Sequence, residues 1–221
     1  MAAVTHLALV NRVLVHMREA QVTELTSDAY AAAVSRFVND ARMSVEDIRH
    51  WEVLRSLVAE SITSGNTAIT VTGTNPRSHI LGVYNTTSQN KLTHKTREWV
   101  LRQNQLGTVT NAEPSVWAYD GFTSTGAMKI VLFAPSDATY TISIDCIIPQ
   151  EELGATDNIT VPSQPVYLRA LATAIAERGE DGGISTQDIM FQYNEALTDA
   201  ITRENQLRYG TNEFQGDWHV I

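Results

Sequence analysis

The chain has 221 residues, and its 16 lysine and arginine residues against 25 aspartate and glutamate residues give it a formal net charge of −9. A chain of this length folds as one domain, or as one domain with a large insertion, and it buries about 70% of the surface of its unfolded chain without needing disulfides or metal ions. The excess of acidic residues and the lack of a run of lysine and arginine argue against sequence-specific contacts with nucleic acid. An acidic wall past which DNA slides is compatible with this charge.

The first 50 residues have the period of two helices. Apolar side chains recur at three- and four-residue steps over 7–17 and again over 30–48, which places them on one face of each helix. Thr26 and Ser27 offer N-cap oxygens for the second helix. A break near Met43 is an open alternative, because a further capping pattern follows it. Neither helix can bury its apolar stripe alone, so we expect the two to form an antiparallel pair.

The middle of the chain, from about Trp51 to Val161, changes to the period of β-strands. Residues 140–148 alternate apolar and polar side chains, which predicts a strand with one buried face, and Cys146 on its apolar side is expected to be a small buried side chain. Turn-forming residues separate further short strands, and this spacing predicts an antiparallel sandwich with a short helix inserted at 93–105. The other strand candidates are Val53 to Ser61, Thr67 to Val71, Ile80 to Tyr84, Val116 to Tyr119 and Met128 to Phe133.

The last third of the chain returns to the helical period. Ser163, closely followed by a proline, marks the start of one helix, and Gly179 marks its end. Ser185 and Asp188 have the spacing of a capping box and open the next helix. After about Asn205 the period fails, although large apolar side chains continue. These side chains are Leu207, Tyr209, Phe214, Trp218 and Ile221.

Helices at both ends therefore bracket a β-rich insertion. We predict an α+β fold in which residues 1–50 and 162–205 form a four-helix bundle, residues 51–161 form an inserted antiparallel β-sandwich-like domain, and residues 206–221 form an extended C-terminal arm. Exposed apolar side chains on such an arm either fold back on their own domain or dock on another chain. Irregularly spaced aromatic residues suit docking into the grooves of a partner.

The sequence contains no constellation of reactive residues, and we therefore predict that the chain is not an enzyme and holds no cofactor. The six histidines never fall at the spacing of a metal-ligand pair, so each is expected to be a surface or interface residue. The adjacent Glu151 and Glu152 point apart and are interpreted as solvated charge. The glycine-rich stretch at 177–183 follows a helix, whereas a phosphate cradle precedes one. We predict no catalytic, cofactor-binding or metal-binding residue.

The N-terminal part does not have the pattern of a targeting segment. Its apolar run at 7–15 is interrupted by Asn11 and Arg12, and no stretch of the chain approaches the length of a transmembrane helix. We therefore expect no membrane contact, and a protein that is made in a reducing cytoplasm or in a particle assembled there.

Several short motifs in the two helical parts occur in a fixed order and spacing. They are ALVNRVLVHMRE at 8–19, VTEL at 22–25, FVNDA at 37–41, LATAIAERGE at 171–180, FQY at 191–193 and LTDAI at 197–201. In these motifs the chain resembles the head-to-tail adaptors of short-tailed bacteriophages (podoviruses), also called the tail tubular protein A family. The resemblance covers the helical parts by sequence and the β-rich part by architecture.

This resemblance implies a structural virion protein. Members of the family carry a β-sandwich inserted in a helical bundle and assemble as a twelve-membered ring beneath the portal. The resemblance implies an adaptor that connects the portal to the tail nozzle (tail tubular protein B), with tail fibres attached nearby, and that lines the DNA ejection channel of a virion assembled in the host cytoplasm. It also implies that the apolar residues of the arm insert into the portal, while the β-rich part faces the nozzle and the fibres. The arm residues are Leu207, Tyr209, Phe214, Trp218 and Ile221.

Two other classes of function stay open from the sequence. In a binding module, the β-sandwich would recognise a tail fibre or a host glycan through exposed Trp99, Trp117 and Tyr119, although we favour the interpretation that these aromatics fill the sandwich core. A hydrolase acting on cell wall or nucleic acid would need convergent carboxylates or metal ligands, which the sequence does not show.

Overall fold

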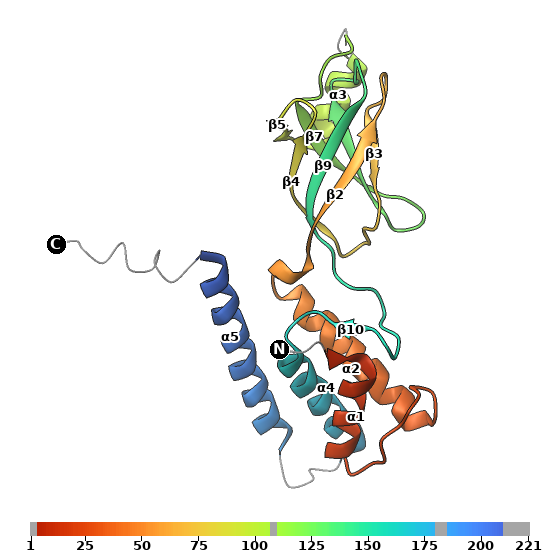
Figure 1. Ribbon diagram of the computed structural model, residues 1–221, viewed down its shortest axis with the longest axis vertical. Helices are drawn as coiled ribbons and strands as arrows, with labels where there is room; N and C mark the ends of the chain where they lie inside the picture. Colours follow the sequence, from red (N-terminus) through yellow and green to blue (C-terminus); the bar gives the residue numbers. More distant parts are fainter. Residues whose placement is uncertain (1–3, 107–109, 180–184, 210–221) are drawn as a thin grey trace, which may run out of the picture. The chain divides into compact units, whose positions relative to one another are not determined.

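The computed structural model describes residues 4–106, 110–179 and 185–209, and the chain divides into two compact units (Figure 1). The first, which we call the helical unit, comprises Met1–Leu54 and Gln150–Ile221, and the second, the β unit, comprises Arg55–Pro149. The described residues are mixed α+β, with helices and largely antiparallel sheets.

Four helices and one very small sheet make up the described part of the helical unit. The helices are α1 (His6–His16), α2 (Ala29–Asp47), α4 (Ser163–Arg178) and α5 (Thr186–Tyr209). The sheet pairs β1 (Val4–Thr5) with β10 (Asn158–Ile159), and a 3-10 turn, η1 (Glu52–Leu54), ends the N-terminal segment. None of the three short elements was predicted, because two or three residues are too few to show a period.

The helix ends follow the capping chemistry of the sequence with one correction. Asp28, and not Thr26 or Ser27, caps α2, since its Oδ1 accepts from the Ala31 amide at 2.7 Å. Thr5 caps α1 in the same way at 3.2 Å. The break near Met43, which the sequence left open, does not occur, because α2 continues to Asp47.

The start of α5 and the end of α4 are confirmed. Gly179 ends α4 with a φ of 68°, a left-handed conformation that glycine adopts without strain. Ser185 Oγ accepts from the Asp188 amide at 3.2 Å at the start of α5. The C-terminal end of α5 lies four residues beyond the predicted one, at Tyr209.

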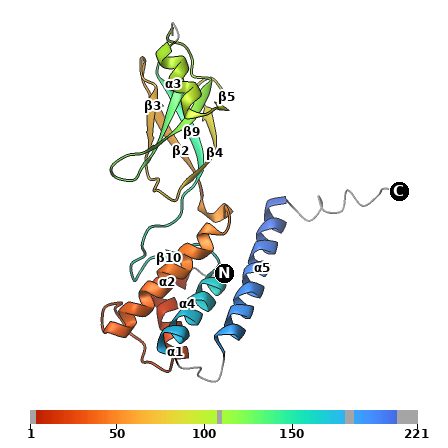
Figure 2. The ribbon, with the colours of Figure 1, turned by 180° about the vertical axis from the view of Figure 1, so that it is seen from behind.

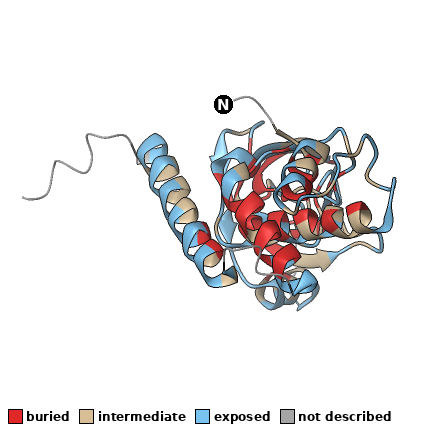
Figure 3. Ribbon diagram, turned by 90° about the horizontal axis from the view of Figure 1, so that it is seen from below, coloured by how far each residue is buried: buried red, intermediate tan, exposed pale blue. Residues whose placement is uncertain are grey.

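Helix α4 is central to the helical unit. It packs against α1, α2 and α5, and α1 also packs against α2. Its buried side chains consequently lie around most of its circumference, whereas α5 is buried along a narrow strip only (Figure 3). The buried apolar side chains of this unit include Leu171 and Ile175 on α4, Val13 on α1, Val38 on α2 and Ile189 on α5.

The β unit consists of two four-stranded sheets that share one apolar core. The strand order is β2-β9-β4-β5 in one sheet and β3-β8-β7-β6 in the other, and all these pairs are antiparallel except β6 with β7. Strand β9 lies between β2 and β4 in both views (Figures 1 and 2). The short helix α3 (Arg97–Leu106) covers Ala118 and Val131 of the second sheet with Val100. The strands are β2 (Arg55–Ile62), β3 (Ala68–Val71), β4 (His79–Asn85), β5 (Asn90–Lys91), β6 (Thr93–His94), β7 (Val116–Phe122), β8 (Met128–Phe133) and β9 (Tyr140–Ile147).

Strand β9 is buried on both faces, whereas its alternating sequence predicted one. The expected apolar side is buried, and it includes Cys146. Burial raises the pKa of the Cys146 thiol to about 11. On the polar side, Asp145 is also buried, because Arg55 from β2 lies over it and donates from Nε and Nη2 to its two carboxylate oxygens at 2.8 and 2.6 Å. The paired carboxylate therefore tolerates a position that the sequence pattern assigned to solvent.

Candidate partner-contact surfaces

A buried polar network anchors the segment by which the chain re-enters the helical unit after the β unit. Arg42 and Glu46 lie one turn apart on α2 with fully buried side chains, and their Nη1 and Oε1 atoms are 2.6 Å apart. Arg42 Nη1 also donates to the Gln150 carbonyl oxygen at 3.0 Å. Asn39, one turn earlier, donates to the Leu153 carbonyl at 3.3 Å and accepts from the Leu153 amide at 3.1 Å. Side chains of α2 thus replace the strand or helix partners that this returning segment lacks.

His6 belongs to the same network, and the prediction that every histidine lies at a surface or interface is wrong for it. Its side chain is fully buried, with Nδ1 2.9 Å from the Leu153 carbonyl oxygen and Nε2 3.2 Å from that of Ser35. The sequence held a signal for this position, since His6 precedes Leu9 and Val10 by three and four residues and so shares the apolar face of α1.

Replacing His6 with leucine is expected to lower the free energy of unfolding by about 1–3 kcal/mol, because a neutral imidazole donates to one of these two carbonyl oxygens and a leucine side chain donates to neither. Urea denaturation of the full chain, followed by circular dichroism, measures the loss. His16→Leu is the comparison at the other end of α1: that exposed histidine shares one side-chain hydrogen bond, with the Tyr167 hydroxyl at 3.2 Å, and we expect its loss to cost about 0.5–1 kcal/mol. Equal effects of the two substitutions would contradict a specific role for His6.

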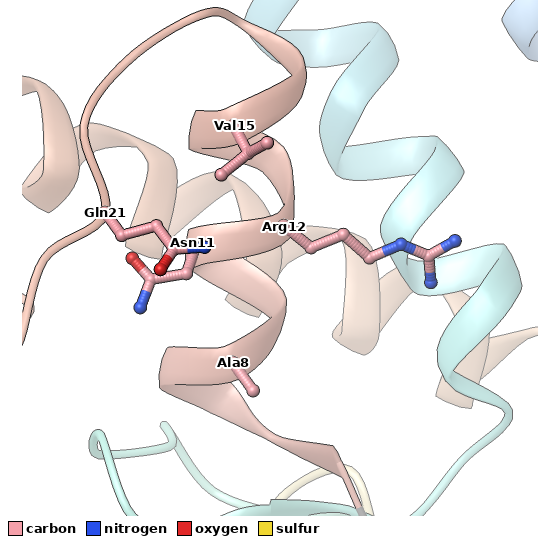
Figure 4. A pocket seen from close by; sticks show the side chains of 5 residues that line it. All are labelled: Ala8, Asn11, Arg12, Val15 and Gln21. Atoms are coloured by element: carbon pink, nitrogen blue, oxygen red, sulfur yellow. The ribbon is translucent and has the colours of Figure 1, made fainter.

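A shallow hollow lies beside α1, and we call it the α1 hollow. It is lined by Ala8, Asn11, Arg12, Val15 and Gln21 (Figure 4). Asn11 holds the link between α1 and α2 against the helix, since its amide group donates to the Val22 carbonyl at 2.9 Å and accepts from the Val22 amide at 2.8 Å. Val15 remains 51% exposed.

Arg12 sits at the edge of the α1 hollow and extends towards α4 (Figure 4). Its Nη2 donates to Gln164 Oε1 at 3.0 Å, and its guanidinium carbon lies 3.8 Å from the centre of the Tyr167 ring. Burial raises the pKa of Tyr167, and the positive charge of Arg12 opposes that shift. These two contacts orient the guanidinium while the side chain stays exposed.

The outward side of α5 combines an exposed aromatic ring with polar and acidic residues, and we call it the α5 outer face. Ile189 and Tyr193 are buried on the opposite side of the helix, while Phe191 between them is 64% exposed. Residues three and four positions apart lie on the same side of a helix, so the outer face continues along α5 from Phe191. It consists of Phe191, Asn194, Glu195, Thr198 and Asp199, which together line a second shallow hollow.

Charged contacts fasten the C-terminal half of α5 to the end of α2 and the turn that follows it. Arg49 Nε lies 3.1 Å from Glu204 Oε2, and Arg49 Nη2 donates to Asn205 Oδ1 at 3.0 Å. Arg208 Nη2 lies 3.1 Å from Glu52 Oε2. The helix therefore stays in place to its last turn although few apolar side chains hold it there.

The residues predicted to dock on the portal fall in two places. Leu207 and Tyr209 belong to α5 and not to an extended arm, which corrects the predicted boundary at Asn205. Leu207 is 88% exposed. Phe214, Trp218 and Ile221 lie outside the described residues, so the docking role of the five residues stays a prediction.

The β unit exposes a pair of aromatic side chains that only partly match the predicted ones. Trp117 is buried in the sandwich core at 7% exposure, and Trp99 packs edge-on against Phe133 with ring centres 5.5 Å apart. Tyr119 and Phe122 are 38% and 41% exposed and meet edge-on at 5.6 Å. Phe122 was not among the predicted residues, because the irregular pairing after Tyr119 breaks the two-residue alternation of β7.

Asp120, within this irregular stretch of β7, links the exposed pair to neighbouring elements. It forms ion pairs with Arg97 of α3 and, at 3.3 Å, with Lys129 of β8. Burial alone would raise the pKa of Asp120, but the hydrogen bonds and charges of these two cations outweigh it and lower that pKa below its usual value. The position of the aromatic pair on the sheet is thereby tied to α3.

The described residues offer contact surfaces rather than an assembled reactive centre. No group of three or more histidine, cysteine, aspartate or glutamate side chains there has the arrangement of a metal site. Among the same residues, no helix combines the length and the apolar character needed to cross a membrane. The helical unit has outward-facing side chains and the β-sandwich has an exposed aromatic pair, and such surfaces suit contacts with other chains.

Comparison with known protein families identifies the class of this protein. The family model of the SU10 adaptor protein matches residues 4–216, and the chain belongs to that family. It is a phage adaptor-type structural protein and a component of the virion. A search of curated proteins finds no match.

Proposed function

We propose that the chain is a ring-forming adaptor that connects the portal of a short-tailed phage to its tail nozzle and lines the DNA ejection channel. The observation that carries the proposal is the match to a phage adaptor family over residues 4–216. Resemblance to the tail tubular protein A family adds the finer parts: a ring of twelve copies, the portal above, the nozzle protein below and tail fibres nearby. The net charge of −9 suits a channel wall along which DNA slides without binding.

The division of labour within the chain follows from this proposal. The helices at 1–50 and 162–205 act as a four-helix bundle that carries ring contacts, and the insertion at 51–161 faces the nozzle and the fibres. The exposed pair of Tyr119 and Phe122 gives that insertion an apolar contact point, and aromatic side chains are enriched at the centres of protein interfaces. Leu207, Tyr209, Phe214, Trp218 and Ile221 dock on the portal.

Removing residues 210–221 tests the portal contact. We expect truncation after Tyr209 to weaken binding to the portal protein by at least about 30-fold, the effect of losing one interface hot spot. The fold should be unchanged, because all of α5 and the ion pair between Arg208 and Glu52 remain. Binding is measured by titrating immobilised portal with the two chains, and folding by their melting curves.

A second truncation, after Asn205, separates the helical and the terminal parts of the arm. It also removes Leu207, so it should bind the portal no better than the first truncation. Wild-type affinity in both variants would show that the arm assignment is wrong. Electron microscopy of the full chain, alone and with portal, tests the ring itself.

A further inference from the structure

We propose that neighbouring copies in the ring meet through two different surfaces, with the α5 outer face of one copy seated on the α1 hollow of the next. The inference rests on the proposed function, since it names the contact by which the ring would form. The occupant of each surface is thus a second copy of this chain. A contact between two unlike surfaces repeats head to tail and closes into a ring when the rotation from copy to copy divides a full turn, whereas a contact between like surfaces stops at two copies.

The first support is the place of the two surfaces in the helical unit. Helix α4 lies between α5 and α1, packing against both (Figures 1 and 2). The α5 outer face points away from α4, because Ile189 and Tyr193 on the other side of α5 are buried. Each copy can therefore offer one surface to each of two neighbours.

The second support is chemical complementarity. The charged residue of the α1 hollow is Arg12, whereas the α5 outer face carries Glu195 and Asp199. Two carboxylates one turn apart repel each other on an isolated helix, and among the described residues no cation pairs with either of them. A guanidinium from the neighbouring copy would relieve that repulsion and would shield two exposed apolar side chains, Val15 and Phe191, from water.

The third support is spacing, which also sets the direction of the two helices. Arg12 lies three residues before Val15 on α1, about 4.5 Å along the axis, and Glu195 lies four residues after Phe191 on α5, about 6 Å along the axis. The charge precedes the apolar residue on α1 and follows it on α5. Both pairs can meet at once only when the two helices run antiparallel.

Cross-linking between two introduced cysteines tests the pairing in the full chain. We expect a Val15→Cys/Phe191→Cys variant, treated with a short bis-maleimide after assembly with portal, to give a ladder of covalent multimers on a denaturing gel. Each single variant should stay monomeric, and a mixture of the two should stop at dimers. The native Cys146 does not interfere, because it is buried and its pKa is raised to about 11.

The matched control places the first cysteine on another exposed apolar position. A Met43→Cys/Phe191→Cys variant should give no ladder, since Met43 lies on α2 and not in the α1 hollow. Dimers from either single variant would reveal a contact between like surfaces and overturn the proposal. Rings seen by electron microscopy without a ladder would overturn this interface and leave the adaptor function standing, while absence of any ring would overturn both.

Charge reversal gives an independent readout. Arg12→Glu and Glu195→Lys are each expected to raise the protein concentration needed for half-assembly by about three- to tenfold. Combining the two should recover most of that loss, because the pair is restored with its signs exchanged. Melting curves check that Arg12→Glu still folds after losing its contact with the Tyr167 ring. Failure of the double variant to recover assembly would contradict the pairing.

Discussion

Replacing Glu46 with alanine is expected to lower the free energy of unfolding by about 3–5 kcal/mol, the usual cost of removing one partner from a buried ion pair. The Glu46 and Arg42 side chains are both fully buried, and the substitution leaves the guanidinium of Arg42 buried without its carboxylate. Urea denaturation of the full chain, followed by far-ultraviolet circular dichroism, measures the loss.

The control for this prediction removes both charges together. An Arg42→Met/Glu46→Leu variant fills a similar volume with apolar atoms, and it should lie within about 2 kcal/mol of the parent chain. The Gln150 carbonyl loses a donor in this variant, whereas Asn39 Oδ1, which also loses Arg42, keeps the Leu153 amide. A loss below about 1 kcal/mol for Glu46→Ala alone would show that water reaches the pair in solution.

The network matters for function because of where the insertion returns to the helical unit. Gln150 and Leu153 stand just after the β unit ends, and α2 holds both through Arg42 and Asn39. These hydrogen bonds fix the point at which the chain re-enters the helical unit. The four polar residues of the network are therefore expected to matter for stability even though none reaches a partner.

The long elements of the fold could be predicted because their side-chain periods are local. Strand β8 has the predicted bounds, Met128 to Phe133, because apolar side chains pack on both of its faces. Met128, Ile130 and Leu132 lie in the core between the sheets, and Val131 and Phe133 pack with Val100 of α3. Helix α2 was placed correctly, but its cap was assigned to Thr26 or Ser27 instead of Asp28, because all three residues can supply the oxygen.

The contact surfaces were harder to predict because they depend on tertiary contacts. The α1 hollow exists because the amide of Asn11 pairs with the backbone of Val22, and no local pattern reveals that pairing. The exposure of Phe191 could be predicted from the sequence, because Phe191 lies outside the apolar stripe that includes Ile189 and Tyr193 on α5. For Phe214 and Trp218, which lie outside the described residues, docking on the portal stays a prediction.

Replacing Trp117 with alanine is expected to destabilise the β unit by about 3–5 kcal/mol, as large aromatic truncations in a packed core do. The Trp117 ring lies in the core shared by the two sheets, 4.5 Å from the His94 ring between centres. A stacking residue for a glycan would instead stand in solvent, and its loss would abolish binding while sparing stability. Thermal and urea denaturation of the full chain decide between these outcomes.

Tyr119→Ala is the matched control on the same strand. Tyr119 is 38% exposed and its main aromatic neighbour is the similarly exposed Phe122, so we expect a loss of about 1 kcal/mol or less. Stable folding of Trp117→Ala would return that ring to the list of candidate binding residues. If attachment to nozzle or fibre is weakened only by Tyr119→Ala and by Phe122→Ala, the contact lies on the exposed aromatic pair. Trp117 supports the sheet from within, and its ring cannot reach a partner from the core.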